Sequence, residues 1–284
     1  MAVKHHEPVL YQEIIHALQP RSSGLYLDGT VGAGGHARGI MEACAPGGQL
    51  LGMDVDPEAL ALARETLAPY GERVTLMQAS YDTMLDAMRE RGWQTVDGIV
   101  LDLGVSSMQL DTRERGFSFQ SEAPLDMRFN PYSGMTAADL VNTAQEEELA
   151  QLLFTYGEER RSRKIARLIV ESRPIRTTTQ LADIVKRAYR ERTRVHPATR
   201  TFQALRIAVN DELACLQRAL PAAIQALRSS GRLAVISFHS LEDRIVKQTF
   251  KKFSGQEMLN IVTKKPVQPK EEEIAENKDK GSNC

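Results

Sequence analysis

The sequence predicts an α/β fold with a mainly parallel sheet and an inserted helical domain. Short apolar runs alternate with helical patterns through the first hundred residues, as in parallel βαβ units buried on both faces. The alternation then stops, and only helical or loop patterns follow from Asp111 to about Pro197. One more apolar run, Leu233–Phe238, comes later and completes the sheet. We therefore expect a helical block inserted between two parts of one sheet.

The first part of the chain is expected to hold four strands separated by helices. The strands are Leu25–Leu27, Leu50–Met53, Val74–Met77 and Gly98–Leu101. The first helix follows the first strand and its glycine-rich loop and ends at about Cys44. The second covers Pro57–Arg64, with proline in its first turn, and the third covers Asp82–Arg91.

The inserted block carries its own helix signals. Thr143 and Glu146 have the spacing of a capping box, and Gly157 is expected to end the helix that follows. Thr179 is expected to cap a further helix. After the block, one long amphipathic helix is predicted from Phe202, kinked or broken at Pro221.

The predicted domain organisation has four parts. The last part is polar, balanced in charge and expected to be disordered. The parts are a first core segment (residues 1–110), an inserted helical domain (111–197), a second core segment (198–262) and a tail (263–284).

Composition narrows the class of protein. Of 284 residues, 42% are hydrophobic and 26% charged, which fits a globular chain with a substantial core. No stretch approaches the roughly 18 apolar residues of a membrane helix, and the N-terminus lacks the apolar region of a secretory signal. Three scattered cysteines, Cys44, Cys215 and Cys284, match no metal spacing and predict a reduced, cytoplasmic location.

The near-neutral total charge hides an acidic and a basic region. Residues 24–110 contain 12 acidic and 5 basic side chains, a net charge of −7. Residues 160–206 contain 14 basic and 3 acidic side chains, a net charge of +11. The basic region is the expected contact for a polyanion such as nucleic acid, although solvated helix faces also carry arginine.

A glycine-rich loop, Gly29–Gly35, follows the first strand, and Asp54 ends the second strand 22 residues beyond Gly32. This context predicts a nucleoside-bearing ligand, with a carboxylate for the ribose hydroxyls. Asp28 stands directly before the loop and is a poor neighbour for a pyrophosphate. The charge therefore favours S-adenosyl-L-methionine, which is cationic, over a nicotinamide dinucleotide. A tight β–α turn with an incidental aspartate is the structural alternative.

Further polar residues follow later strands, at the sheet edge where ligands of such folds lie. Tyr81 follows the third strand and either flanks an adenine or packs in the core. Asp102, Ser106 and Ser107 follow the fourth strand, and His239 follows the fifth. The segment His196–Arg206 offers two arginines and two hydroxyls at a helix start, a pattern suited to phosphate.

Longer stretches of the chain resemble the MraW-type methyltransferases, which methylate the exocyclic N4 amine of a cytidine in small-subunit ribosomal RNA. The matching stretches are His6–Leu10, Asp28–His36, Leu101–Asp111, Arg115–Phe119, Pro124–Arg128, Thr155–Arg160, His196–Arg206 and Ile236–Arg244. The resemblance implies a Rossmann-like class I methyltransferase fold and S-adenosyl-L-methionine as cofactor. It also implies a cytoplasmic bacterial enzyme, or an organellar relative, acting on RNA of the small ribosomal subunit within the assembled particle.

The resemblance assigns cofactor contacts to seven positions, of which His36 and Gln109 rest on it alone. They are Gly34, Gly35, His36, Asp54, Tyr81, Asp102 and Gln109. A group that accepts the amine hydrogen would orient the nitrogen lone pair. The candidates are Asp102, Ser106, Ser107 and His239. Two other functions stay open at this point: a noncatalytic RNA-binding factor for ribosome assembly, and a nicotinamide-dependent oxidoreductase.

The chain departs from the family pattern at its C-terminus. The family pattern runs into a final apolar strand, whereas residues 278–284 are polar. Loss of a strand near the edge of the sheet is therefore expected, and it would expose backbone groups and apolar surface.

Overall fold

The computed structural model describes residues 8–189, 196–263 and 265–269. The chain divides into two compact units. The sheet unit comprises residues 1–104 and 213–284, and the helical unit comprises residues 105–212. The insertion predicted at 111–197 lies inside the helical unit, and most of the tail predicted at 263–284 lies outside the described residues.

The sheet unit contains a five-stranded sheet in the order β3-β2-β1-β4-β5, and all four pairings are parallel. This confirms the predicted α/β fold with a parallel sheet. The order reverses between β1 and β4, which is the place where ligands bind in such folds. The strands are β1 Leu25–Asp28, β2 Gln49–Asp54, β3 Val74–Gln78, β4 Val96–Asp102 and β5 Leu227–Ile236.

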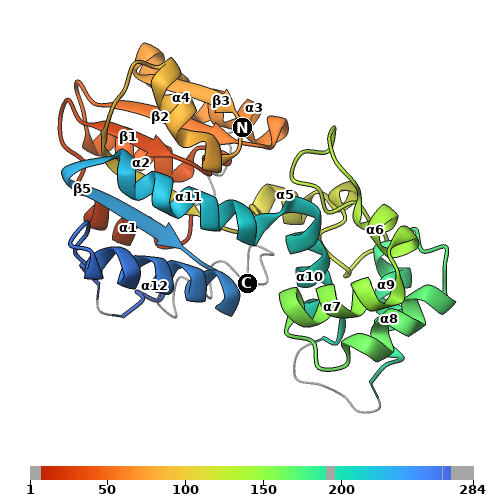
Figure 1. The fold of residues 1–284 in the computed structure, drawn as a ribbon. Helices are drawn as coiled ribbons and strands as arrows, with labels where there is room; N and C mark the ends of the chain where they lie inside the picture. The colour runs from red at the N-terminus through yellow and green to blue at the C-terminus, as the bar shows by residue number, and fades with distance from the viewer. Residues whose placement is uncertain (1–7, 190–195, 264, 270–284) are drawn as a thin grey trace. The chain divides into compact units, whose positions relative to one another are not determined.

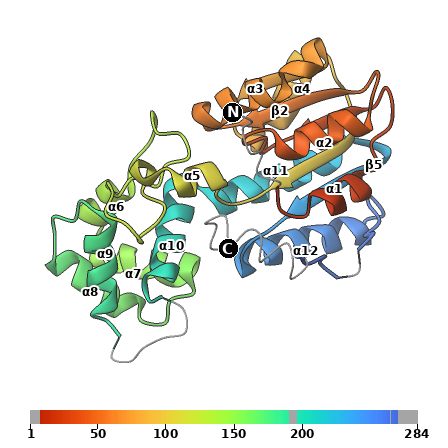
Figure 2. The ribbon, with the colours of Figure 1, turned by 180° about the vertical axis from the view of Figure 1, so that it is seen from behind.

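Helices cover both faces of the sheet because alternate strand residues point to opposite sides (Figures 1 and 2). Tyr26, Leu50 and Val100 pack under α1, α2 and α3. Leu27, Leu51 and Ile99 share the other core with α4, α11 and α12. The helices are α1 Tyr11–Leu18, α2 Gly35–Ala43, α3 Pro57–Leu67, α4 Met84–Glu90, α11 Glu212–Ala226 and α12 Ser240–Gly255.

The first four strands lie within two residues of their predicted positions. The fifth differs, because β5 begins at Leu227 and ends at Ile236, so Phe238 belongs to the loop that follows. β5 is one of the two edge strands, and in residues 256–263 and 265–269 no further strand follows α12.

The helical unit is built around one apolar core that includes Leu149, Leu153, Ile165, Leu181 and Leu205. An isolated bridge between Pro124 and Thr177 is the pairing found among its described residues. Its helices are α5 Ser107–Asp111, α6 Ala137–Thr143, α7 Glu146–Gly157, α8 Ser162–Glu171, α9 Thr178–Lys186 and α10 Ala198–Asn210.

Two predicted helix caps are wrong by two residues. Thr143 is the last residue of α6, where its hydroxyl donates to the Asp139 carbonyl, and Gln145 forms the capping box of α7 instead. Thr177, not Thr179, caps α9, and its partner is Gln180. Thr143–Glu146 and Gln145–Glu148 both have the spacing of a capping box, so spacing does not decide the first cap. At the second cap, Thr177–Gln180 has this spacing and Thr179–Ala182 does not, so the sequence did hold a signal for Thr177.

The long helix predicted from Phe202 is two helices. The break lies at Asp211, which adopts a left-handed conformation with φ 51° and donates its N–H to the Ile207 carbonyl. Pro221 lies inside α11 and does not end it. An aspartate tolerates the left-handed region better than most residues, and this signal is weaker in sequence than a proline.

Gly157 is the last residue of α7, as predicted, but the left-handed residue that stops the helix is Glu158. Gly157 is needed for packing, because a Cβ there would lie 2.5 Å from the carbonyl oxygen of Arg200 in α10. The glycine thus allows α7 and α10 to approach closely.

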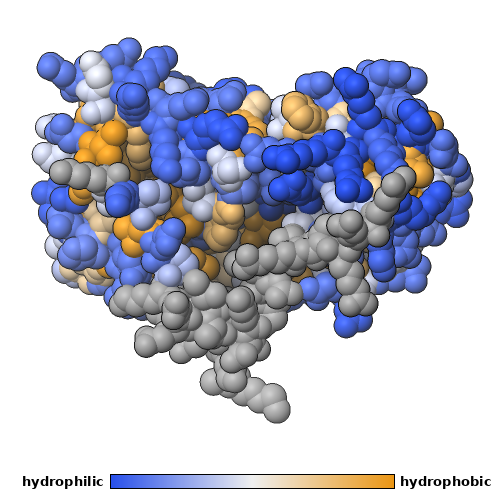
Figure 3. Space-filling model, turned by 90° about the horizontal axis from the view of Figure 1, so that it is seen from below, coloured by the Kyte–Doolittle hydropathy of each residue, from blue (hydrophilic) through white to orange (hydrophobic). Residues whose placement is uncertain are grey.

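No helix within the described part of the chain is long and apolar enough to cross a membrane. Charged and polar side chains dominate the face shown in Figure 3, with smaller apolar areas between them.

Candidate active site

Three neighbouring strands end in carboxylates at the same edge of the sheet. Asp28 ends β1, Asp54 ends β2 and Asp102 ends β4. Because β1 pairs with both β2 and β4, Asp28 occupies the middle position. This is the predicted ligand edge, and its dominant feature is negative charge.

Asp28 is almost fully buried and accepts a hydrogen bond from the Thr30 amide at 3.1 Å. Burial raises the pKa of its carboxyl to about 7; His36 and the Thr30 amide oppose the shift, and Asp102 and Asp54 add to it. The free protein therefore holds this carboxyl partly protonated near neutral pH. A cation brought to the site would favour its ionised form.

The glycine loop is fixed to the end of β2. The Gly32 amide donates to one oxygen of Asp54 at 2.9 Å, and the Asp56 amide donates to the other at 2.9 Å. Burial raises the pKa of Asp54 to about 6, and these two amides oppose the shift. The Val55 amide also hydrogen-bonds to this carboxylate, so about one of its roughly four acceptor positions remains for a ribose hydroxyl. Asp56 itself caps α3 by accepting from the Glu58 amide.

Gly34 is the N-cap of α2, with φ 89°, a conformation that side chains rarely adopt. The loop thereby turns into α2 directly beside the edge and places His36 in its first turn.

His36 and Asp102 form the centre of the candidate site. Nε2 of His36 lies 3.5 Å from Oδ2 of Asp102. Both ring nitrogens of His36 and Oδ1 of Asp102 are buried and have no hydrogen-bond partner among the described residues. Buried polar atoms without partners are costly, so this pair is arranged for a polar ligand. The Asp102 amide donates to the Thr30 hydroxyl at 2.7 Å, which fixes the end of β4 against the loop.

Tyr81 begins a short 3₁₀ turn after β3 and is half-buried. A Cβ on Gly29 would lie 2.9 Å from the Tyr81 Cβ, so the loop and the tyrosine are in close contact. The ring also borders the core shared with α4 and α11. The position agrees with both predicted roles, flanking an adenine and packing.

His239 lies on the same edge, since Ile236 pairs with Asp102. It is the N-cap of α12, and its Nδ1 accepts from the Glu242 amide at 3.4 Å. Its Nε2 lies 3.3 Å from Oε1 of Glu242, whose carboxylate also accepts the Phe238 amide at 2.9 Å. Both ring nitrogens are thus turned toward Glu242, which gives His239 a capping role in addition to the predicted one.

Ser106, Ser107 and Gln109 belong to the helical unit, directly after the unit boundary. Ser106 and Gln109 form a reciprocal capping box: the Ser106 hydroxyl accepts the Gln109 amide at 3.2 Å, and Gln109 Oε1 accepts the Ser106 amide at 3.1 Å. Ser107 is the first residue of α5 and is half-buried. The pairing of Ser106 with Gln109 had a signal in the sequence, because the two residues have the spacing of a capping box.

The phosphate pattern predicted at His196–Arg206 is only partly exposed. Arg206 binds Glu212 through two hydrogen bonds of 2.8 and 2.9 Å, and Thr201 is fully buried. Thr199 and Arg200 remain on the surface. Successive residues of a helix face different sides, so two of the four predicted phosphate-binding side chains, Thr201 and Arg206, are used inside the protein.

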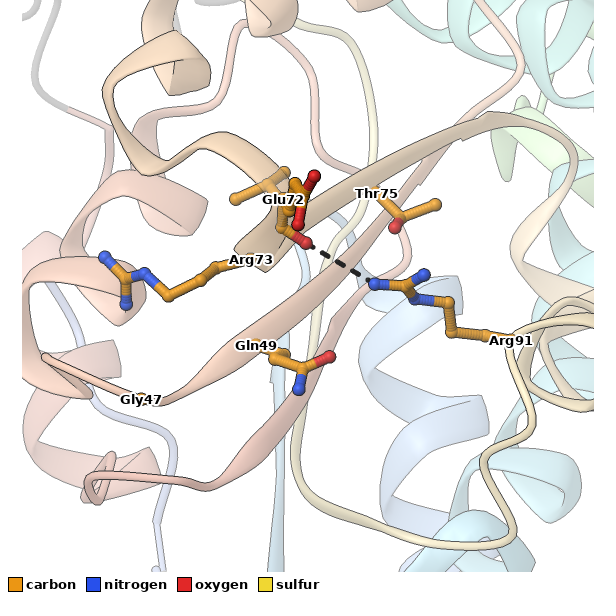
Figure 4. A pocket seen from close by; sticks show the side chains of 7 residues that line it. Gly47, Gln49, Glu72, Arg73, Thr75 and Arg91 are labelled. Atoms are coloured by element: carbon orange, nitrogen blue, oxygen red, sulfur yellow. Dashed lines mark hydrogen bonds between the residues drawn. The ribbon is translucent and has the colours of Figure 1, made fainter.

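A cavity of about 650 Å³ lies at the opposite edge of the sheet, near the amino ends of β2 and β3 (Figure 4). It is lined by Gln49, Arg73, Thr75 and Arg91, among others, and Arg91 donates to the Glu72 carbonyl. It is remote from the three carboxylates and shares no residue with the candidate site.

The ligand edge is suited to a cation that carries hydroxyl groups. The negative charge of three carboxylates disfavours a pyrophosphate, and the glycine loop gives its Gly32 amide to Asp54. Of the two ligands considered from the sequence, the geometry fits S-adenosyl-L-methionine better than a dinucleotide.

Comparisons with known proteins give a consistent result. The "Ribosomal RNA small subunit methyltransferase H" of Geotalea uraniireducens is 51% identical, over 96% of this chain and 94% of the relative. The proteins of that name from Heliobacterium mobile and Cyanothece sp. are 50% and 53% identical, over 96% of this chain and 95% and 90% of the relatives.

Solved structures resemble the chain weakly. An example is a SAM-dependent O-methyltransferase from Thermotoga maritima, with a TM-score of 0.31 and 23% identity over 36% of this chain and 38% of that one. The sequence pattern of the MraW methylase family, by contrast, matches residues 3–283. The chain therefore belongs to the MraW methylase family.

Proposed function

We propose that the protein transfers the methyl group of S-adenosyl-L-methionine to the exocyclic N4 amine of a cytidine in small-subunit ribosomal RNA. Membership in a methylase family favours transfer of a methyl group over the oxidoreductase and the noncatalytic factor. The observation that carries the proposal is the His36–Asp102 contact at an acidic sheet edge, where three buried polar atoms have no hydrogen-bond partner among the residues that the structure describes.

The residues present fit the proposed cofactor. Asp28, Asp102 and Asp54 supply negative charge for its ammonium and sulfonium groups, and Asp54 retains acceptor capacity for a ribose hydroxyl. We assign cofactor binding to Gly34, Gly35, His36, Asp54, Tyr81, Asp102 and Gln109. When bound, the cofactor supplies an already activated methyl group, so the task of the protein is mainly placement.

Asp102 is the leading candidate to receive the amine. Its Oδ1 has no hydrogen-bond partner among the described residues, and its backbone is fixed through Thr30. Accepting an N–H from the cytosine amine would orient the nitrogen lone pair toward the methyl carbon and disperse the developing positive charge. Ser106, Ser107 and His239 remain candidates for the same role; the capping contacts of Ser106 and His239 make those two weaker ones.

The substrate is proposed to be the small subunit in its assembled form, in the cytoplasm. A base that is already unpaired costs less to place in such a site than one within a duplex. The exposed cations of the helical unit are proposed to hold the neighbouring phosphates.

The test is transfer of a labelled methyl group to purified small ribosomal subunits, with large subunits and protein-free RNA as comparisons. Digestion to nucleosides and mass spectrometry are expected to yield N4-methylcytidine from the small subunit. Label in no RNA, with RNA binding intact, would support the noncatalytic factor instead. Calorimetry with S-adenosylhomocysteine and with NAD tests the cofactor independently, and binding of NAD alone would overturn the proposal.

A further inference from the structure

We propose that the stacked rings of Phe119 and His196 form a platform on which an unpaired RNA base stacks, with Arg161, Lys164 and Arg200 holding the adjacent phosphates. This inference rests on the proposed function, because it names the part of the helical unit that receives the RNA. All five residues belong to that unit, and none is among the assigned cofactor or catalytic residues.

The two rings are well ordered by their neighbours. The centroids of Phe119 and His196 are 4.5 Å apart with an interplanar angle of 23°, and the edge of Phe202 packs on Phe119 at 4.9 Å. Phe202 is buried and Phe119 half-buried, whereas His196 is exposed. The stack therefore begins in the core and ends at the surface with an imidazole ring.

The orientation of His196 is fixed by a second contact. Its Nδ1 accepts a hydrogen bond from the Ala198 amide at 3.2 Å, at the start of α10. This places the donor hydrogen on Nε2 in the neutral ring. An exposed side chain usually samples several rotamers, but this one is held by stacking and by a hydrogen bond, so little entropy is lost when a base stacks on it.

One cation lies in the first turn of the same helix, and two more lie at the start of α8. Arg200, in the first turn of α10, donates to the Glu158 carbonyl at 3.2 Å. Arg161 and Lys164 both donate to the Ala188 carbonyl, at 2.7 and 2.9 Å, and Arg161 lies over the ring of Tyr189 at 4.5 Å. Each cation keeps further N–H donors, since guanidinium has five and ammonium three.

Tyr189 and Glu159 show that these cations form one cluster. The Tyr189 hydroxyl donates to the buried Glu159 carboxylate at 2.6 Å. Burial and that carboxylate raise the pKa of Tyr189 to about 12, and the charges of Arg161 and Arg200 both oppose the shift. Arg161, which is the N-cap of α8, and Arg200, which is in α10, therefore lie near the same phenol.

An aromatic face beside a cluster of cations is typical of sites for single-stranded nucleic acid, where rings stack on bases and cations follow the backbone. A protein partner with an acidic surface would use the cations but has no need for an exposed, oriented ring. A loss of binding when the ring at position 196 is removed therefore distinguishes RNA from an acidic protein partner in the experiment.

The experiment compares three substitutions at one position. His196→Ala removes the ring and the acceptor for the Ala198 amide. His196→Asn keeps a short polar side chain with an oxygen acceptor for that amide but has no ring. His196→Trp keeps an aromatic face. Methyl transfer to small subunits is measured over a range of subunit concentrations, together with affinity for S-adenosylhomocysteine.

Stacking on one base contributes about 1–3 kcal/mol, which corresponds to about 5- to 150-fold in affinity. His196→Ala and His196→Asn are expected to raise KM for the subunit within this range, with kcat and S-adenosylhomocysteine affinity nearly unchanged. His196→Trp is expected to stay within about threefold of the parent. Rescue by asparagine would show that the residue only holds the Ala198 amide, and equal loss in all three variants would show a fold defect; either result overturns the platform.

Direct binding keeps this test independent of the proposed reaction. RNA binding by the variants is measured with a single-stranded oligonucleotide containing 2-aminopurine, whose fluorescence is quenched by stacking. Quenching by the parent and by His196→Trp, but not by His196→Asn, supports the platform even if no methyl transfer occurs. Methyl transfer that is insensitive to all three variants, with equal quenching, overturns the platform and leaves the proposed function intact.

Discussion

The sheet unit and the helical unit use charge in opposite ways. At the sheet edge, Asp28 is buried and Asp54 and Asp102 are half-buried; Asp28 and Asp54 accept backbone amides, and Asp102 lies beside His36. In the helical unit, Arg161, Lys164 and Arg200 are exposed and bind carbonyl oxygens at helix ends. The buried carboxylates act in a poorly screened environment, whereas the exposed cations are screened by salt.

This difference indicates which ligand each unit can discriminate. Partly desolvated carboxylates favour a small cation strongly and at short range, as a cofactor site requires. Exposed cations attract a long polyanion at a distance and tolerate varied geometry, as an RNA surface requires. The predictions below separate the two units by changing one and measuring both ligands.

The largest effect is expected for Asp102→Ala at the sheet edge. A positioned group that accepts a proton contributes about 10²- to 10⁴-fold to the rate, so methyl transfer should fall by that factor. RNA affinity should not change. The matched control is Asp86→Ala on α4, where the carboxylate is exposed and pairs with Arg89. Full methylation by the Asp102 variant, with normal cofactor affinity, would exclude this residue from the site.

Gly157→Ala is expected to lower the stability of the helical unit alone. The added Cβ would meet the Arg200 carbonyl at 2.5 Å, and a backbone atom cannot move aside as a side chain can. Overpacking of this kind costs about 1–3 kcal/mol, measurable by thermal unfolding. Gly255→Ala at the end of α12 is the control, because a Cβ there meets nothing within 4 Å. Equal stability of the two variants would contradict the packing role of Gly157.

The sequence predicted the sheet better than the helical unit. Buried parallel strands are short apolar runs, and β1 to β4 are recognisable from such runs without knowledge of their partners. The starts of the helices in the helical unit depend on which of several polar residues adopts the extended backbone conformation of an N-cap. Thr143 and Gln145 each have a glutamate three residues later, so spacing does not separate them. Thr177 could have been preferred over Thr179, because only Thr177 has a glutamine at the capping-box position.

The candidate site was predictable where it depends on topology. Parallel strands place their carboxyl ends together, so Asp28, Asp54 and Asp102 follow from the strand pattern. Side-chain pairing was not predictable, because it depends on rotamers. The capping of α12 by His239 and the bond between Arg206 and Glu212 appear only in three dimensions. A histidine or arginine used in this way looks identical in sequence to a catalytic or phosphate-binding one.

Salt should separate the ligands of the two units. If Arg161, Lys164 and Arg200 each contact one phosphate of single-stranded RNA, the slope of log affinity against log salt is about −2. RNA affinity then falls about 20-fold between 50 and 200 mM salt, and Arg200→Gln reduces the slope by about 0.7. Affinity for S-adenosylhomocysteine should change less than about twofold. A salt slope that Arg200→Gln leaves unchanged would place the phosphates elsewhere.

The smallest effect is the pH dependence of cofactor binding at the sheet edge. The pKa of Asp28 is raised to about 7 mainly by burial, so the free protein takes up a proton there as pH falls through 7. A cationic cofactor prefers the carboxylate, and below pH 7 that proton must be displaced for it to bind. Affinity for S-adenosyl-L-methionine should therefore fall with decreasing pH, by at most about tenfold per pH unit for one proton.

Asp28→Asn should remove most of this dependence, leaving a weaker one near pH 6 from Asp54. Calorimetry in buffers of different ionisation enthalpy counts the protons released on binding, and the count near pH 6.5 should drop in the variant. The stability of the cofactor-free protein changes in the opposite sense. A raised pKa in the folded state stabilises it below the unfolded pKa near 4, and this contribution is lost as pH rises through 7. An affinity that is flat with pH in the parent would mean that the charge of Asp28 does not reach the cofactor, and the acidic edge would then act through Asp54 and Asp102 alone.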